Sequence, residues 1–312
     1  MSPGPAAPPP IGQLVDVGGY RLHLACQGDG GPTVVMEAAI GETGLMWSLV
    51  QPAVAKTTRA CVYDRAGLGW SDPSPRPRTA EIMVEELHTL LGTAQVPGPY
   101  VLVGHSFGGL LVRLYAARHP QGVAGLVLVD SAHEQQYRRA PTEIQELLPQ
   151  FEEQARQQFQ GLKALIASGS LDPAMLPIPP QLPTAAADTF RALVAASPKH
   201  VETLMAEQQA VGAIHAELAT AGISSLGDLP LMVVSHGQPM AMPGLAEEVN
   251  QANEQLWQQL QAELAGLSSR GQLVVAHDSG HYIQLERPQL VLDAIAEVLT
   301  AAQANQDRTR RR

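Results

Sequence analysis

The sequence predicts an α/β fold with a mostly parallel central sheet, helices on both faces and an inserted helical cap. Short apolar, β-branched runs alternate with segments whose apolar residues recur at helical spacing. A G-x-S-x-G motif stands where one apolar run passes into a helical segment. A long stretch between Asp130 and Leu229 contains helical patterns but no strand-like run, which is typical of a cap inserted between two strands.

The elements follow from local patterns. Residues 14–17 and 20–26 flank Gly18-Gly19, which predicts a β-hairpin. Further apolar runs predict strands at 33–38, 60–63, 100–103, 123–129, 229–234 and 272–276. Helical spacing predicts helices at 79–91, 110–118 and 289–301, and another that begins at Glu247 and Glu248 and continues to residue 264. Within the cap, helices are predicted at 143–166 and 185–221, separated by a Pro-rich segment.

These elements define the predicted domains. Residues 1–12 are expected to form a flexible arm, 13–132 and 226–304 an α/β core, 133–225 the helical cap, and 305–312 a basic tail. The tail contains the only basic cluster, which is predicted to be a solvated terminus: Arg308, Arg310, Arg311 and Arg312.

Composition narrows the function classes. The formal net charge of −10 argues against nucleic acid as a partner. Cys26 and Cys61 are too few for a disulfide scaffold and are predicted to be two buried free thiols. The sequence has no signal peptide pattern and no membrane-spanning run, so a cytoplasmic protein is predicted. It has no metal-ligand spacing, dinucleotide fingerprint or phosphate loop, so neither a metal nor a cofactor is predicted.

Ser106 is the predicted nucleophile. It stands between Gly104 and Gly108, after the strand 100–103 and before the helix 110–118. Small residues on both sides of a serine let strand and helix pass closely in a sharp turn that exposes the hydroxyl. The helix N-terminus favours negative charge, and the Phe107 amide is free to donate to an oxyanion. A chance glycine turn is the structural alternative, but the strand–turn–helix context favours the nucleophile.

His281 is the predicted general base, because a hydroxyl is a poor nucleophile without one. It closely follows the strand 272–276. Sheets of this type meet their ligands at the carboxyl ends of the strands, which places His281 and Ser106 at the same edge. His277 is the competing candidate, but it directly ends its strand and is expected to be a rim residue. His105 lies within the turn and is expected to point elsewhere.

Three motifs resemble the α/β-hydrolase superfamily, in its branch of lid-bearing serine esterase-like enzymes. They are the G-x-S-x-G turn, residues 61–71 (CVYDRAGLGWS), and Ser279-Gly280-His281 followed by Glu286-Arg287-Pro288. The resemblance extends from about Val15 to Ala301, and the chain order of nucleophile, acid and base also matches. It implies hydrolysis through an acyl-enzyme. Haloalkane dehalogenases and epoxide hydrolases of this superfamily need a carboxylate nucleophile, so Ser106 argues against both.

The resemblance also places the acid. Many members carry an Asp after the seventh strand, but this chain has no carboxylate there before Glu247 and Glu248. Some lid-bearing members carry the acid at the end of the sixth strand, which here is Asp130. Asp130 is therefore the predicted acid, with capping of the next segment as its alternative role.

The oxyanion hole is predicted from the same comparison. Many members carry His-Gly after the third strand, where this chain reads Glu37-Ala38-Ala39-Ile40-Gly41. The Ile40 amide is expected to lie opposite that of Phe107, because an amide donor needs no particular side chain. Glu37 is predicted to be a satisfied buried carboxylate rather than a group that shapes the pocket.

The predicted activity is hydrolysis of carboxylic esters with small or medium, largely apolar groups. Aminopeptidase-like, lactonase, hydroxynitrile lyase and perhydrolase activities are alternatives on the same fold, and a non-catalytic hydrolase-fold binding protein is a further one. The expected partner is a small-molecule ester. Apolar residues of the cap are candidates for the pocket wall, although packing within the cap is the other role open to them; the candidates are Phe151, Phe159 and Phe190.

Overall fold

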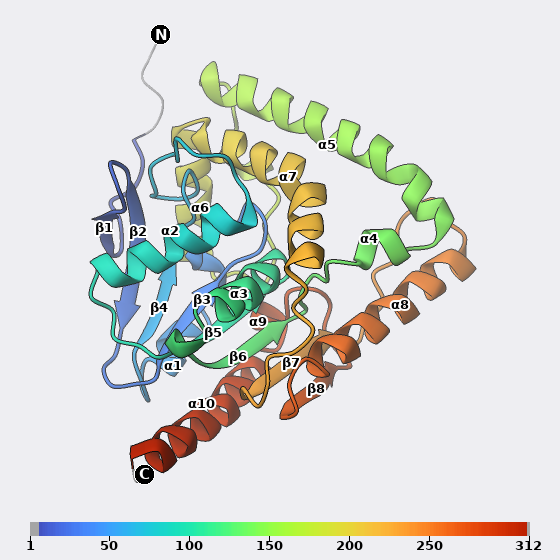
Figure 1. The fold of residues 1–312 in the computed structure, drawn as a ribbon. Helices are drawn as coiled ribbons and strands as arrows, with labels where there is room; N and C mark the ends of the chain where they lie inside the picture. The colour runs from blue at the N-terminus through green and yellow to red at the C-terminus, as the bar shows by residue number, and fades with distance from the viewer. Residues whose placement is uncertain (1–5, 311–312) are drawn as a thin grey trace.

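A single mixed sheet forms the centre of the molecule (Figure 1). The computed structural model describes residues 6–310, and within them eight strands pair in the order β1-β2-β4-β3-β5-β6-β7-β8. The hairpin β1–β2 and the pair β2–β4 are antiparallel, and all other neighbours are parallel. The α/β fold predicted from the sequence is therefore confirmed. The strands are β1 (Gln13–Asp16), β2 (Arg21–Gln27), β3 (Thr33–Glu37), β4 (Ala60–Tyr63), β5 (Tyr100–His105), β6 (Val123–Val129), β7 (Leu231–His236) and β8 (Gly271–Ala276).

Helices cover both faces of the sheet, which explains why its central strands are apolar throughout. Alternate residues of a strand point to opposite faces. Leu102 of β5 packs with α2 (Ala80–Thr93), α3 (Phe107–Arg118) and α8 (Glu247–Ala265). Its neighbours Val101 and Val103 pack with α1 (Gln51–Val54), α9 (Ile283–Glu286) and α10 (Pro288–Arg310) on the other face. Two short 3-10 helices, η1 (Gly44–Trp47) and η2 (Pro120–Gly122), lie in the core loops.

Between β6 and β7 the chain is helical. It forms α4 (Gln136–Arg139), α5 (Thr142–Ala167), η3 (Pro173–Met175), α6 (Thr184–Ala196) and α7 (Lys199–Ala221), with α5 and α7 at the top of the view in Figure 1. The prediction of a single helical stretch over 185–221 is wrong, because this part of the chain forms two helices, α6 and α7. Ser197 is extended there, since the following Pro198 disfavours helical geometry in the residue before it.

The described structure near the two ends of the chain consists of a long C-terminal helix and an N-terminal segment with one contact to the core loops. Helix α10 continues to Arg310, beyond the boundary predicted at residue 304, because Ala and Gln favour helix in this part of the sequence. In the arm, the carbonyl of Pro8 accepts a hydrogen bond from Nε1 of Trp70 at 2.8 Å. Residues 1–5 of the predicted arm and residues 311–312 of the predicted basic tail lie outside the described residues.

Cys26 and Cys61 form a disulfide, so the prediction of two free thiols is wrong. Strands β2 and β4 pair antiparallel, and their register sets Cys26 directly opposite Cys61. The sequence does not reveal which strands pair, so the disulfide between the two residues could not be predicted from it.

The disulfide can be tested by thiol titration. Protein unfolded in guanidinium without reductant is expected to show no reactive thiol, and two after reduction. A Cys26→Ser/Cys61→Ser double variant is expected to lose about 2–4 kcal/mol of unfolding free energy, because the bond restricts the unfolded chain. Two titratable thiols in the unreduced protein would show that Cys26 and Cys61 are free, as the sequence predicts.

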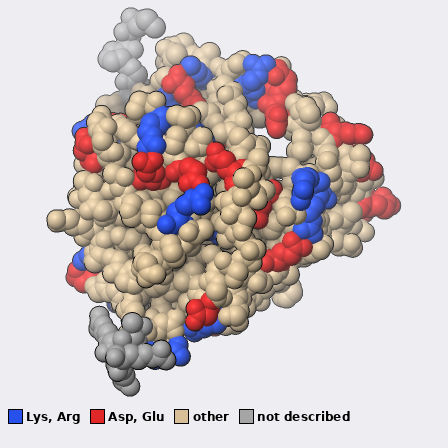
Figure 2. All heavy atoms as spheres, in the orientation of Figure 1, with Lys and Arg blue, Asp and Glu red and all other residues tan. Residues whose placement is uncertain are grey.

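The surface carries no large patch of one charge on the face shown in Figure 2, as far as the described residues are drawn. Acidic and basic side chains lie there in small mixed groups, in keeping with exposed ion pairs such as Arg139 with Glu263 and Arg76 with Glu85. None of the helices within residues 6–310 is both long and apolar enough to cross a membrane.

Candidate active site

Ser106 lies at the sharp junction between β5 and α3. Its backbone has φ 51° and ψ −118°, a conformation that non-glycine residues seldom adopt and that is retained where the surroundings enforce it. The Ser106 amide donates to the carbonyl of Val129 at 3.1 Å, and its carbonyl accepts from the Ala132 amide at 2.9 Å. A Cβ atom at Gly104 would lie 2.6 Å from the carbonyl oxygen of Gly108, so glycine is required there. The predicted strand–turn–helix elbow is thus present around Ser106.

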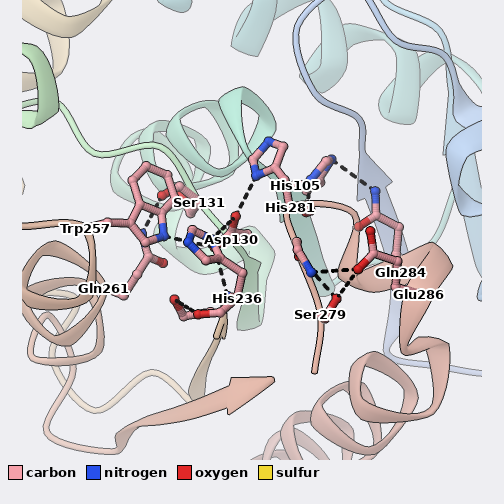
Figure 3. A network of polar contacts seen from close by, with 12 residues as sticks. His105, Asp130, Ser131, His236, Trp257, Gln261, Ser279, His281, Gln284 and Glu286 are labelled. Carbon is pink, nitrogen blue, oxygen red and sulfur yellow. Dashed lines mark hydrogen bonds and ion pairs between the residues drawn. The ribbon is translucent and has the colours of Figure 1, made fainter. Parts of the chain in front are cut away.

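Asp130 and His281 meet at the same edge of the sheet (Figure 3). Asp130 directly follows β6, and His281 stands in the loop after β8. Nδ1 of His281 lies 2.5 Å from Oδ2 of Asp130. A carboxylate at this position keeps the proton on Nδ1, which leaves Nε2 free to accept one. The imidazole adjoins the Ser106 turn, because its ring centre lies 4.6 Å from that of His105.

The Asp130 carboxylate is fully buried and receives several donors besides His281. Its Oδ1 accepts from the His236 amide and from Nε1 of Trp257, each at 3.0 Å. Nδ1 of His236 lies 2.8 Å from both carboxylate oxygens. Burial alone would raise the pKa of Asp130, but the contacts with His236 and His281 outweigh it and keep this pKa well below its usual range. Asp130 is therefore ionised at neutral pH.

His236 is placed between two carboxylates. Its Nε2 lies 3.1 Å from Oε2 of Glu254 on α8, opposite the contact between Nδ1 and Asp130. Burial by itself lowers the pKa of His236, but Asp130 and Glu254 together raise it above its ordinary value. His236 and Trp257 lie on one side of Asp130 and His281 on the other (Figure 3), so they fix the orientation of the carboxylate.

Hydrogen bonds with Glu286 and His105 hold the loop that carries His281. Oε2 of Glu286 accepts from the Gly280 amide at 2.6 Å and from Oγ of Ser279 at 2.9 Å. Nε2 of His105 lies 2.9 Å from the His281 carbonyl, and Nδ1 of His105 lies 3.1 Å from Nε2 of Gln284. These contacts explain why Ser279-Gly280-His281 and Glu286 occur together as a motif.

The loop after β3 faces the start of α3. Phe107 begins α3, so its amide belongs to the first turn, where amides have no partner within the helix. No hydrogen bond to the Ile40 amide is found in the described part of the chain. Glu37, buried at the end of β3, accepts from the Tyr63 hydroxyl and pairs with Arg65 at 2.6 Å. The expectation that Glu37 is a satisfied buried carboxylate is confirmed.

Comparison with known proteins identifies the family. The family model described as "Alpha/beta hydrolase family" matches residues 30–294. The chain belongs to the alpha/beta hydrolase family.

Individual relatives match the hydrolase to different extents. It is 26% identical over 282 residues to the uncharacterized protein YqjL of Bacillus subtilis, covering 88% of this chain and 87% of YqjL. It is 38% identical over 136 residues to a probable transporter, efuK, of Hormonema carpetanum, covering 41% of this chain but only 20% of that protein's length. A solved thermophilic esterase from Thermogutta terrifontis shares the fold, with a TM-score of 0.63 and 21% identity over 91% of this chain and 94% of the esterase.

The three Phe residues predicted at the pocket wall lie in different surroundings. Phe151 of α5 is exposed, with 38% of its surface accessible. Phe159 packs against a cluster within the helices between β6 and β7 that contains Ile166 and Val201. Phe190 packs against this cluster and also against one that joins α6 to residues near the sheet, such as Leu45 and Trp70. Of the three Phe residues, Phe190 alone contacts both clusters.

Sequence reasoning missed His236, Trp257 and the contact between His105 and His281. His236 ends β7, the strand next to β6, so its position at the carboxyl edge was a signal that went unused. Trp257 had no signal, because only the docking of α8 brings it to Asp130. His277 is exposed, as expected of a rim residue, and Glu247 and Glu248 are exposed at the start of α8.

Proposed function

We propose that the hydrolase cleaves carboxylic esters with small or medium, largely apolar groups through an acyl-enzyme on Ser106. His281 is the general base and Asp130 the acid of a catalytic triad. The observation that carries this proposal is the 2.5 Å contact between Nδ1 of His281 and Asp130, at the sheet edge where the strained Ser106 turn stands. The same residues support ester rather than carbon–halogen or epoxide chemistry, because the nucleophile is a hydroxyl and not a carboxylate.

Each residue has one role in the proposed reaction. His281 Nε2 takes the proton of Ser106 as its Oγ attacks the ester carbonyl, and Asp130 stabilises the imidazolium that forms. The proton then passes from His281 to the leaving alkoxide, and the acyl group remains on Ser106. Water, deprotonated by His281, then attacks the acyl carbon, the bond between this carbon and Oγ of Ser106 breaks, and His281 returns its proton to Oγ, which releases the carboxylic acid and regenerates Ser106.

The amides of Ile40 and Phe107 are the proposed oxyanion hole. One follows β3 and the other begins α3, and neither amide has a hydrogen-bond partner within residues 6–310. Backbone donors of this kind stabilise the negative charge that develops on the substrate oxygen, and one such donor contributes about 10²- to 10³-fold to kcat.

An active-site probe and an ester series test this function together. A fluorophosphonate probe is expected to label the protein once, and peptide mass spectrometry is expected to place the adduct on Ser106. Among p-nitrophenyl esters, kcat/KM is expected to peak at a short or medium acyl chain and to fall for long chains. Peptide and lactone substrates run in parallel rank the alternative activities.

The control is the same probe on heat-unfolded protein, which should not react because Ser106 needs the folded triad. Absence of labelling in folded protein would contradict the proposal and favour a non-catalytic binding protein. Labelling of Ser106 with peptides or lactones hydrolysed much faster than esters would keep the triad and overturn the substrate class.

A further inference from the structure

One face of the cap helix α7 rests on two loops of the core. Its members are His200, Thr203, Leu204 and Glu207, which recur at the spacing of a single helix face and are here called the inner face of α7. His200, Leu204 and Glu207 contact Gly41 in the loop that carries Ile40. Thr203 and His200 contact Gly67 and Gly69 in the loop after β4.

The Gly41 peptide is held on three sides. Its amide donates to Oε2 of Glu207 at 3.0 Å, and its carbonyl lies 2.9 Å from Nε2 of His200. A Cβ atom at Gly41 would lie 2.3 Å from Cδ1 of Leu204, and the residue has φ +67°. Only glycine therefore fits beneath α7 in this conformation.

The contacts of His200 define its protonation state. Burial lowers the pKa of His200 to about 4, so the ring is neutral at pH 7. Nδ1 accepts from the Gly69 amide at 3.3 Å, which leaves the proton on Nε2, where it is donated to the Gly41 carbonyl. One tautomer satisfies both contacts, and His200 therefore bridges the two core loops.

Glu207 acts on the same loop through Arg65. The guanidinium lies 2.7 and 2.9 Å from the carboxylate of Glu207 and donates to the carbonyls of Ala38 at 2.8 Å and Ala39 at 2.7 Å. Although burial raises the pKa of Glu207, Arg65 outweighs this and keeps it ionised. The carbonyls of Ala38, Ala39 and Gly41 thus all accept hydrogen bonds, whereas the Ile40 amide has no hydrogen-bond partner within the described residues.

We propose that the inner face of α7 positions the oxyanion donor at Ile40, with His200 and Glu207 as positioning residues that touch no reacting atom. The cap helix is then a fixed part of the active site, and its docking on Gly41 sets how well the transition state is stabilised. This inference rests on the proposed function for its catalytic consequence, but the docking itself can be measured without any substrate.

Two substitutions of His200 separate its two contacts. In His200→Asn, the amide oxygen replaces Nδ1 as acceptor for Gly69, but the side chain is too short to reach Gly41. In His200→Gln, the longer amide again offers a donor at the Gly41 carbonyl. His200→Asn is expected to lower kcat about 10- to 100-fold with KM changed less than about threefold, and His200→Gln to recover most of that loss.

The affinity for a trifluoromethyl ketone separates the proposed role of His200 from a merely structural one. A structural role would leave this affinity unchanged. Oγ of Ser106 adds to the carbonyl of this ketone, and the tetrahedral adduct carries an oxyanion. The inhibition constant of the ketone should therefore rise in parallel with the loss in kcat for His200→Asn. Glu202→Gln is the matched control, because Glu202 lies exposed on the same helix and pairs with Lys163. It should leave kcat and the inhibition constant unchanged.

Hydrogen–deuterium exchange decides the inference independently of catalysis. In the parent protein, the Gly41 amide, which donates to Glu207, should be protected from exchange, whereas the Ile40 amide has no partner among residues 6–310 and should exchange freely. His200→Asn should release the protection at Gly41 while β7 keeps its own. Rapid exchange of the Gly41 amide in the parent, or a folded His200→Asn variant with full kcat, would overturn the inference. If the parent hydrolyses no ester, the proposed function fails, and the exchange measurement alone judges the docking.

Discussion

Replacing Ser106 with alanine is expected to lower kcat by about 10⁴- to 10⁶-fold, because no other group at the elbow can form the acyl-enzyme. The loss should fall on kcat rather than KM, since the substrate still fits the same pocket. The fold should persist, because Ser106 contributes only its backbone to the hydrogen bonds with Val129 and Ala132. Initial rates on the best p-nitrophenyl ester, together with a thermal melt, measure both effects.

The control for Ser106→Ala must separate chemistry from backbone strain. Gln95 offers it, because this exposed residue also has a positive φ, 54°, and lies outside the candidate active site. Gln95→Ala should keep full activity and change stability about as much as Ser106→Ala does. A Ser106→Ala preparation that retains more than a few per cent of parent activity, free of contaminating esterase, would remove Ser106 from the nucleophile role.

The strands and the Ser106 turn could be predicted because their signals are local. The runs at residues 60–63 and 123–129 coincide with β4 and β6, and the elbow depends only on a strand, a serine between glycines and a helix. Long-range pairing leaves no such signal. The Cys26–Cys61 disulfide depends on the register of β2 against β4, which two isolated apolar runs cannot reveal.

The same distinction applies to the candidate site. His281 could be proposed because it follows a predicted strand and parallel strands end at a common edge. Asp130 could be proposed because some lid-bearing members of the superfamily carry the acid at the end of the sixth strand. The donors around Asp130 could not be predicted from the sequence. Trp257, for example, lies 127 positions away on α8 and contacts Oδ1 only when that helix packs on the sheet. The contact between α7 and Gly41 is likewise invisible in the sequence, where residues 199–221 have only the pattern of a cap helix.

Replacing Asp130 with asparagine is expected to lower kcat by up to about 10⁴-fold. The His236 amide and Nε1 of Trp257 both donate to Oδ1, so the asparagine oxygen must occupy that position. The amide nitrogen then takes the place of Oδ2 and donates to His281. His281 can accept only by moving its proton to Nε2, which leaves it unable to deprotonate Ser106. Steady-state kinetics on the best ester measure the loss.

Two further variants show whether Asp130 is the acid. Glu247→Gln and Glu248→Gln alter the first carboxylates after the seventh strand, which are exposed on α8, and each should keep nearly full kcat. A fast Asp130→Asn together with an inactive Glu247→Gln or Glu248→Gln would move the acid to the start of α8, after the seventh strand. Full activity in all three would mean that His281 acts in a dyad with Ser106.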